Sequence, residues 1–230
     1  MAAEYTAVRT AARTAAILTL FAGLFTAAMA VTYRMTKPDI DAAVAEVKHN
    51  LIAEILPPDH YNNALLDDAV KLSPTEALGL DEGGLVYRAR QDGQPVALIV
   101  EAQANNGYGG SIGLIVAVRK DGSISGVRVT NHKETPGLGD YVDPKKDRNK
   151  ASPWINQFTD ASFDKAPESA WQVKKDGGIF DFHTGATISA RAVTGAVAKA
   201  LAWTNAHRDA LFAAPAGSRF SDVGAGGNAQ

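Results

Sequence analysis

The sequence predicts an α+β protein that is anchored to a membrane by a single N-terminal helix. Residues 14–33 form an uncharged, apolar run with the length of a bilayer-spanning helix. Two Asp-Gly pairs, at 92–93 and 121–122, each separate two apolar runs, which is a strong β-hairpin pattern. A helical pattern of apolar residues begins near Thr187. Strands followed by a helix late in the chain favour α+β.

The apolar run at 14–33 lies between Arg13 and Arg34. About twenty residues at roughly 1.5 Å each span about 30 Å, the thickness of the hydrocarbon layer. A cleaved signal peptide is the alternative, because the start is basic and residues 28–30 read Ala-Met-Ala. We favour a retained transmembrane helix, because the run is longer than the apolar core of an ordinary signal peptide. Residues 1–13 are then a short cytoplasmic N-terminus.

Residues 34–58 are predicted to form a juxtamembrane helix or stalk. Pro38-Asp39 suits a helix start, and Pro57-Pro58 suits its end. One face of this helix is apolar, and its residues are Ile40, Val44, Val47, Leu51, Ile52 and Ile55. Residues 59–82 give no clear pattern, although they open the domain that we expect at 59–212.

The two hairpins are expected at 85–90 with 96–101, and at 112–119 with 124–130. Because 112–118 is apolar on both faces, it is predicted to be a covered central strand. We expect a further strand at Trp171–Lys174 and a short helix at Trp154–Phe158, within a loop-rich insert. The tail at 213–230 is rich in Gly and Ala and is predicted to be disordered.

Composition excludes several classes of function. The 230-residue chain has a formal net charge of −2, which gives no basis for a nucleic-acid partner. It contains no cysteine, so disulfides, iron–sulfur ligation, thiolate zinc sites and cysteine nucleophiles are excluded. His132 and Glu134 follow an H-x-E spacing, but the cysteine ligands of zinc deaminases are absent, so we expect no metal site. No G-x-S-x-G motif is present, which argues against a serine hydrolase.

The start of the last helix is the main candidate site. Thr187 and Ser189 carry hydroxyls where a helix cap is common. A helix N-terminus also suits a phosphate, because its N–H groups are unpaired and carry partial positive charge. The residues alone leave both interpretations open, a capped helix or an anchor for a phosphate-bearing cofactor. Asn106–Gly110, just before the predicted central strand, is either a tight turn or a point of close approach to a ligand.

Four motifs occur in order behind the apolar run: GYGG, HKETPGLGD, WINQF and KKDGGIFDFHTGATISARAV. Together they resemble the G subunit of the Rnf-type ion-translocating electron-transport complex. The resemblance implies a mixed α/β FMN-binding domain with FMN joined to a threonine by a phosphoester. The attachment motif D-x-x-S/T-G-A-T is filled by Asp181, Thr184, Gly185, Ala186 and Thr187, and the last threonine is the modified one.

The resemblance also implies what attaches the flavin and what surrounds it. A separate Mg²⁺-dependent flavin transferase that uses FAD would modify Thr187. The ETPGLG loop, Glu134 to Gly139, is expected to pack by the isoalloxazine, with Thr135, Leu138 and Gly139 as contacts. Lys174 is a further candidate near the phosphate, since lysine serves as a point charge for phosphate. Ser189 is then left as a helix cap.

The implied function is an electron relay in a complex that couples transfer between ferredoxin and NAD to ion translocation. Partner subunits would supply the iron–sulfur clusters, the NAD site and the ion path, and the flavin domain would lie on the periplasmic side of the bacterial inner membrane. One alternative is the C subunit of the sodium-pumping NADH:quinone reductase, which shares the flavin motif and the ETPGLG loop. A different kind of alternative is a tethered binding module without a cofactor.

Overall fold

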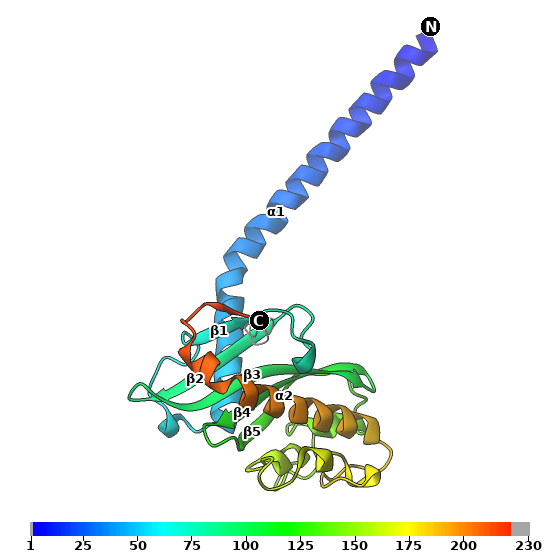
Figure 1. Ribbon diagram of the computed structural model, residues 1–230. Coiled ribbons are helices and arrows are strands. Elements are labelled where there is room, and N and C mark those ends of the chain that lie inside the picture. Colours follow the sequence, from blue (N-terminus) through cyan, green and yellow to red (C-terminus); the bar gives the residue numbers. More distant parts are fainter. Residues whose placement is uncertain (1, 222–230) are drawn as a thin grey trace, which may run out of the picture. The chain divides into compact units, whose positions relative to one another are not determined.

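The computed structural model describes residues 2–221, and these divide into two compact units (Figure 1). The first unit ends at Lys48, and the second begins at His49. A single helix, α1 (Ala2–Ile55), contributes the first unit and the opening residues of the second.

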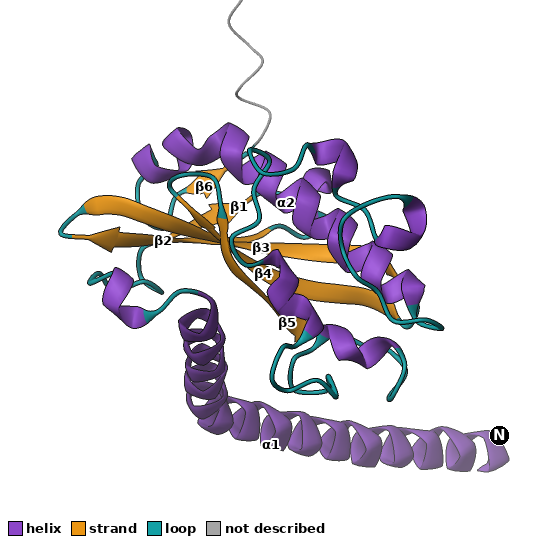
Figure 2. Ribbon diagram, turned by 90° about the horizontal axis from the view of Figure 1, so that it is seen from below, coloured by secondary structure: helices purple, strands orange, loops and turns teal. Residues whose placement is uncertain are grey.

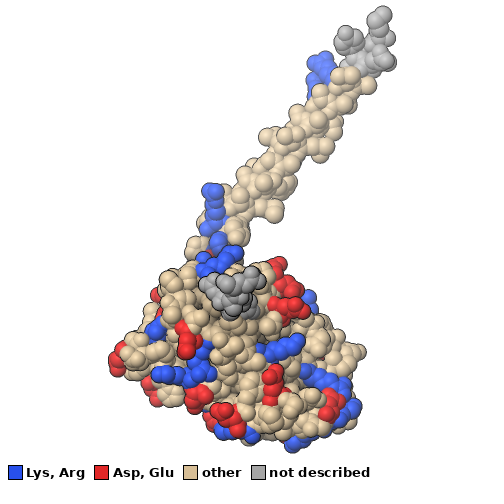
Figure 3. All heavy atoms as spheres, viewed as in Figure 1, with Lys and Arg blue, Asp and Glu red and all other residues tan. Residues whose placement is uncertain are grey.

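Helix α1 is long and apolar enough to cross a membrane. Its large apolar side chains between Ile17 and Val31 are exposed, and the middle of the helix carries no charge between two groups of basic side chains (Figure 3). We expected a separate helix to begin at Pro38, but the helix runs through this residue without a break. A proline inside a helix removes one backbone N–H donor and crowds the preceding turn, so Pro38 weakens the helix locally. The helix ends at Ile55, before Pro57-Pro58, as predicted.

The second unit is built on one six-stranded sheet. Its strands are β1 (Ala69–Leu72), β2 (Gly84–Gln91), β3 (Gln94–Gly107), β4 (Gly110–Arg119), β5 (Ile124–Asn131) and β6 (Arg219–Phe220). The order is β5-β4-β3-β2-β1-β6, and every pair is antiparallel except β1 with β6. Both predicted hairpins are present, with Asp92 and Gly93 at positive φ as a two-residue hairpin turn requires. Asn106–Gly110 contains a third tight turn, in which Gly107 pairs with Gly110.

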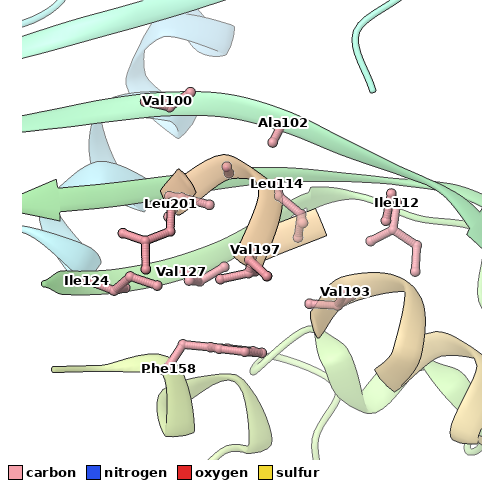
Figure 4. Close-up of a cluster of buried hydrophobic side chains, with 14 of the residues drawn as sticks. Val100, Ala102, Ile112, Leu114, Ile124, Val127, Phe158, Val193, Val197 and Leu201 are labelled. Carbon is pink, nitrogen blue, oxygen red and sulfur yellow. The ribbon is translucent and has the colours of Figure 1, made fainter. Parts of the chain in front are cut away.

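Helix α2 (Thr187–Ala213) covers one face of this sheet (Figure 2). Its buried residues meet alternate side chains of β3, β4 and β5, and Phe158 closes the cluster from the side (Figure 4). The residues that face each other across this layer are Val100, Ile112, Leu114, Ile124, Val127, Val193, Val197 and Leu201. The predicted apolar face of the helix is confirmed except at Ile188, which is exposed.

The opposite face of the sheet is covered by the last turns of α1. Leu51, Ile52 and Ile55 are buried there against Ile99 and Ile115. Because Ile115 points to this face while Leu114 and Val116 point to the other, β4 is buried on both sides, as expected for a covered strand. Ile40, Val44 and Val47 of the predicted apolar face are exposed, so only its last part packs on the sheet.

The segment between β5 and α2 contains four 3₁₀ helices: η3 (Gly139–Val142), η4 (Trp154–Phe158), η5 (Glu168–Ala170) and η6 (Lys174–Asp176). The short helix expected at Trp154–Phe158 is confirmed. The strand expected at Trp171–Lys174 is wrong, because Val173 and Phe180 form only one isolated parallel bridge. The apolar residues here pack in an aromatic cluster, with Phe180 4.7 Å from Phe158 and 5.1 Å from Trp171 between ring centroids.

Two regions without a confident sequence pattern are ordered. Residues 59–82 contain η1 (Pro58–His60, which begins just before them), β1 and η2 (Glu76–Leu78). The disorder predicted from residue 213 onward is wrong for 213–221, because Arg219–Phe220 pairs with β1 and Phe220 lies edge-on to Trp203. Strand β6 was not predicted, because the residues around it are Gly, Ala and Ser, a composition typical of disordered tails. Residues 222–230 lie outside the described residues.

Candidate functional site

Three segments that are distant in sequence meet at the N-terminal end of α2. They are the β3–β4 turn, the loop from Glu134 to Gly139, and residues 185–189. Between them lies a cavity of about 150 Å³, called cavity 1 here, lined by Tyr108, Glu134, Thr135, Leu138, Gly139, Gly185, Ala186, Ile188 and Ser189. Cavity 1 therefore brings together the four predicted loop residues and two residues of the predicted attachment motif. The loop residues are Glu134, Thr135, Leu138 and Gly139, and the motif residues are Gly185 and Ala186.

The rim of cavity 1 is apolar and exposed. Tyr108 is 68% exposed, Leu138 52% and Ile188 46%, and one of the three comes from each segment. Three large apolar side chains around one opening leave apolar surface in contact with water. Such a patch marks a place where a ligand or a partner binds.

The floor of cavity 1 is built around the buried carboxylate of Glu134, which is 4% exposed. Its Oε1 accepts a hydrogen bond from the Gly109 N–H at 2.9 Å, and its Oε2 accepts one from the Ser189 hydroxyl. One side chain thus joins the turn, the loop and the helix. A Cβ at Gly139 would overlap Glu134 Oε2 and Ser189 Oγ, so this position accepts only glycine without a shift.

A second cavity of about 210 Å³, called cavity 2, lies beside the first and shares Leu138 and Ala186 with it. Its other lining residues are Gly137, Asp140, Tyr141, Lys146, Arg148, His183 and Thr184. Lys146 and Arg148 form no ion pair with another described residue, so cavity 2 offers cationic groups for an anion. The His183 ring stacks on Tyr141 with 3.8 Å between centroids.

Thr187 is the first residue of α2 and is 8% exposed. It lines neither cavity, although its neighbours Ala186 and Ile188 line cavity 1. Its hydroxyl forms no hydrogen bond to another described residue, and no side chain caps the helix. The cap expected from Ser189 is wrong, because Glu134 takes the Ser189 hydroxyl. The helix start therefore keeps N–H groups that no side chain satisfies.

Asp181 and Lys174 lie apart from the other predicted residues. Lys174 Nζ is 2.6 Å from Asp181 Oδ1, and neither residue lines cavity 1 or cavity 2. Lys174 thus contacts the first residue of the attachment motif, and the cations that line cavity 2 are Lys146 and Arg148, which the sequence reasoning missed. Nothing in their sequence context distinguishes them from a solvated basic turn.

In cavity 1, the lining residues that sequence reasoning did not assign as cofactor contacts are Tyr108, Ile188 and Ser189. Tyr108 carried a signal, because it is the only large residue in the GYGG turn. Ile188 stands where the helical spacing of apolar residues predicts a buried side chain, but it is exposed. No group of three or more His, Asp or Glu residues among residues 2–221 has the arrangement of a metal site.

Comparisons with known proteins match both parts of the chain to protein families. Residues 107–202 match the FMN-binding domain family, and residues 1–55 match the RnfG N-terminal region. A protein of Pseudomonas aeruginosa, named as the G subunit of an ion-translocating oxidoreductase complex, is 42% identical over 205 residues, which cover 89% of this chain and 94% of that protein. Proteins of the same name from Shewanella loihica and Salmonella typhimurium are 40% and 44% identical, covering 90% and 80% of this chain and 96% and 85% of their own lengths.

Proposed function

Because the chain belongs to the G-subunit family of ion-translocating oxidoreductase complexes, we propose that it carries FMN covalently on Thr187 and relays electrons within such a complex. Membership of this family makes the chain a membrane flavoprotein subunit of the Rnf type. The covalent bond, the coupling between ferredoxin and NAD, and the periplasmic side of the inner membrane are our proposals. They are supported by the attachment motif, by the uncharged run at 14–33 within helix α1 and by the resemblance of the four motifs.

The residues around cavity 1 fit an isoalloxazine ring. Tyr108, Leu138 and Ile188 offer exposed apolar surface to a planar ring, and burying it under a ligand is favourable at about 25 cal/mol per Å². The backbone of Gly139 lines the cavity directly, because a side chain at this position would collide with Glu134 Oε2 and Ser189 Oγ. A ring lying here would also meet the buried Glu134, a fixed charge or hydrogen-bonding group beside the redox centre.

The start of α2 fits the phosphate end of the cofactor. Thr187 opens the helix, and an uncapped N-terminus presents N–H groups and partial positive charge to a phosphodiester. Lys146 and Arg148 in cavity 2 add positive charge within the same region. The free Thr187 hydroxyl loses no hydrogen bond within the described structure when it is modified.

Attachment requires a partner enzyme, because an unaided threonine hydroxyl is a weak nucleophile. The Thr187 oxygen would attack the flavin-side phosphorus of FAD, the phosphoanhydride bond would break, and AMP would leave. The hydroxyl proton would pass to a base of the transferase. Because Thr187 is buried, the transferase must reach it through the exposed residues Thr184 and Gly185.

Bound FMN would supply one-electron and two-electron redox chemistry. The chain itself supplies the anchor, the apolar rim that excludes water from one side of the ring, and the helix start that fixes the phosphate. A tethered cofactor cannot diffuse away, which suits a relay between neighbouring subunits. The curated relatives are named as G subunits of ion-translocating oxidoreductase complexes, which favours this role over that of the C subunit in a sodium-pumping quinone reductase.

The proposal is tested by co-expressing the chain with a flavin transferase and denaturing the purified protein. Wild-type protein is expected to keep flavin fluorescence and an FMN-sized mass addition. Thr187→Ala is expected to lose both, while the matched variant Thr184→Ala keeps part of the flavin. Acid-stable flavin on Thr187→Ala would contradict the attachment site. Wild-type protein without flavin would favour a tethered binding module.

A further inference from the structure

Residues 181–186, called the acceptor loop here, are held at both ends by hydrogen bonds to their main chain. The Trp154 indole N–H donates to the Asp181 carbonyl at 2.6 Å, and the Asp181 N–H donates to Gln157 Oε1 at 2.7 Å. Both partners belong to η4, the WINQF helix. The first residue of the loop is therefore fixed on both of its backbone groups.

Tyr141 holds the other end of the acceptor loop. Its hydroxyl accepts a hydrogen bond from the His183 N–H and donates one to the Ala186 carbonyl, each at 3.3 Å. The Tyr141 ring is buried, edge-on to Trp154 at 5.4 Å and stacked on His183 at 3.8 Å between centroids. One hydroxyl thus bridges the main chain of residues 183 and 186, immediately before Thr187, and adds to the direct bond from the Ala186 N–H to the His183 carbonyl at 3.0 Å.

Gln157 indicates that this arrangement is not explained by stability alone. Only its Oε1 can accept from an N–H, so the bond to Asp181 dictates the orientation of the amide. Its Nε2 is then buried with no partner among the described residues. A buried unpaired donor costs about 1–3 kcal/mol. The side chain keeps the Asp181 N–H in place despite that cost.

Thr184 and Gly185 form the open outer surface of this loop, whereas Asp181 pairs with Lys174, Phe182 packs against the core and His183 stacks on Tyr141. His183, Thr184 and Gly185 are exposed, and Gly185 has a φ of 89° with open space where a Cβ would lie. The loop thus has a fixed backbone and an open outer surface. This is the geometry that a modifying enzyme needs, since it must bind the loop and find one hydroxyl at a defined place.

We propose that Tyr141, Trp154 and Gln157 are positioning residues for flavin attachment: they hold the acceptor loop in the shape that presents Thr187 to the flavin transferase. The inference rests on the proposed function, because it concerns the same threonine. It assigns a role to the WINQF helix, whose side chains touch the loop that carries the attachment motif and do not line cavity 1 or cavity 2.

The chain offers a matched control for Trp154. Trp171 is also buried, and its indole N–H also donates to a main-chain carbonyl, that of Ala166, at 3.1 Å. Trp154→Phe and Trp171→Phe each remove one indole hydrogen bond and keep an aromatic ring. Only the first releases the acceptor loop. Tyr141→Phe has a similar control in Tyr61→Phe, because the buried Tyr61 hydroxyl has no partner among the described residues.

The test measures initial rates of flavin incorporation into full-length, flavin-free protein in detergent, with purified transferase and FAD. Varying the acceptor concentration separates kcat from KM, and thermal unfolding is recorded for each variant. We expect kcat to fall by about tenfold or more in Trp154→Phe and Tyr141→Phe, because a misplaced nucleophile reacts slowly. Both control variants are expected to stay within about twofold of wild type, since neither touches the acceptor loop.

Equal rates in Trp154→Phe and Trp171→Phe, at equal thermal stability, would overturn the inference. If Trp154→Phe does not fold, Tyr141→Phe decides, because it removes a single oxygen atom. Tyr141→Phe at the wild-type rate would overturn the inference as well. Wild-type protein that takes up no flavin would overturn the proposed function together with it, which is a separate and recognisable result.

Discussion

Glu134 is the side chain through which the three segments of cavity 1 are joined. The buried carboxylate accepts from Gly109 and Ser189, and its loss would leave the buried Ser189 hydroxyl without this partner and release the β3–β4 turn at Gly109. The glycine at 139 belongs to the same arrangement, because its missing Cβ makes room for Glu134 Oε2 and Ser189 Oγ. The geometry of cavity 1 therefore depends on a few polar contacts below an apolar rim.

Gly139→Ala is expected to lower the free energy of unfolding by about 1–3 kcal/mol, because the added methyl group overpacks a filled site. The measurement is urea unfolding of the full chain in detergent. Gly195→Ala is the matched control, since a Cβ there meets nothing within 4 Å inside α2. That control is expected to be neutral or to stabilise the protein by about 0.5–1 kcal/mol. Equal destabilisation of both variants would contradict the packing of Gly139.

Tyr141 gives a pH dependence whose sign follows from its burial. Burial raises the pKa of this hydroxyl to about 12, above its usual value of 10.0. The unfolded chain therefore releases the proton first, so stability is intact below pH 10 and falls as pH rises toward 12. The loss is expected to approach about 2–3 kcal/mol.

The check is a series of urea unfolding curves at alkaline pH for wild type and Tyr141→Phe. The phenylalanine variant is expected to lack this part of the alkaline loss. Burial also raises the pKa of Tyr61, so Tyr61→Phe measures the background from a tyrosine outside the site. An alkaline loss that is the same in wild type and Tyr141→Phe would contradict the assignment.

Helix α2 is fixed at its C-terminal end by a pair of arginines from β2. Arg88 is buried, pairs with Asp68, and donates to the carbonyls of Leu211 and Ala214. Arg90 also pairs with Asp68, at 2.9 Å, and lies nearer the surface. Cations at a helix C-terminus satisfy its free carbonyls and its partial negative charge. These contacts tie the helix that begins at Thr187 to the sheet.

Arg88→Met is expected to cost about 1–3 kcal/mol, because it leaves the carbonyls of Leu211 and Ala214 without their donor, while Asp68 keeps Arg90 as its partner. Arg90→Met is expected to cost about 1 kcal/mol, since a partly exposed pair contributes less. Thermal and urea unfolding of the two variants provide the comparison. A larger loss from Arg90→Met than from Arg88→Met would contradict the role given to the buried arginine.

The sequence predicted those elements whose signal is local. Asp92-Gly93 and Asp121-Gly122 define their hairpins, and the two-sided apolar run defines β4. The strand at Trp171–Lys174 was not realised, because aromatic residues also pack in clusters without a ladder, as Trp171 does against Phe180. Strand β6 was missed because its partner β1 is distant in sequence and its flanks are Gly and Ala.

The candidate site was predictable where motif residues line it and not where it depends on long-range contacts. The loop from Glu134 to Gly139 lines cavity 1 with Gly185 and Ala186, as the motifs indicated. Ser189 was read as a cap because a helix start suits a hydroxyl, but a carboxylate 55 residues earlier takes it. Lys174 is predicted near the phosphate because it is close in sequence to the attachment motif, and Lys146 and Arg148 carry no comparable signal. The sequence alone did not show that Lys174 forms an ion pair with Asp181.

The whole chain combines an apolar helix with an FMN-binding domain. Labelling of introduced cysteines can measure on which side of the membrane each part lies. The absence of cysteine makes single-cysteine labelling clean. Ser169→Cys places a thiol at an exposed position of the second unit, and Ala7→Cys places one before the uncharged run. In intact cells with a permeabilised outer membrane, an impermeant maleimide is expected to label Ser169→Cys only. Ala7→Cys is expected to react after lysis. The reverse pattern would contradict the periplasmic placement of the domain.

The most direct test of the central proposal is to find which hydroxyl carries the flavin. Cleavage after Lys175 and Arg191 releases residues 176–191, whose only hydroxyl side chains are Thr184, Thr187 and Ser189. Tandem mass spectrometry of this peptide, from protein matured with the transferase, distinguishes the three. The account predicts an FMN-sized addition on Thr187, with Thr184 and Ser189 unmodified. An addition on Thr184 or Ser189, or an unmodified peptide from protein that retains flavin, would contradict it.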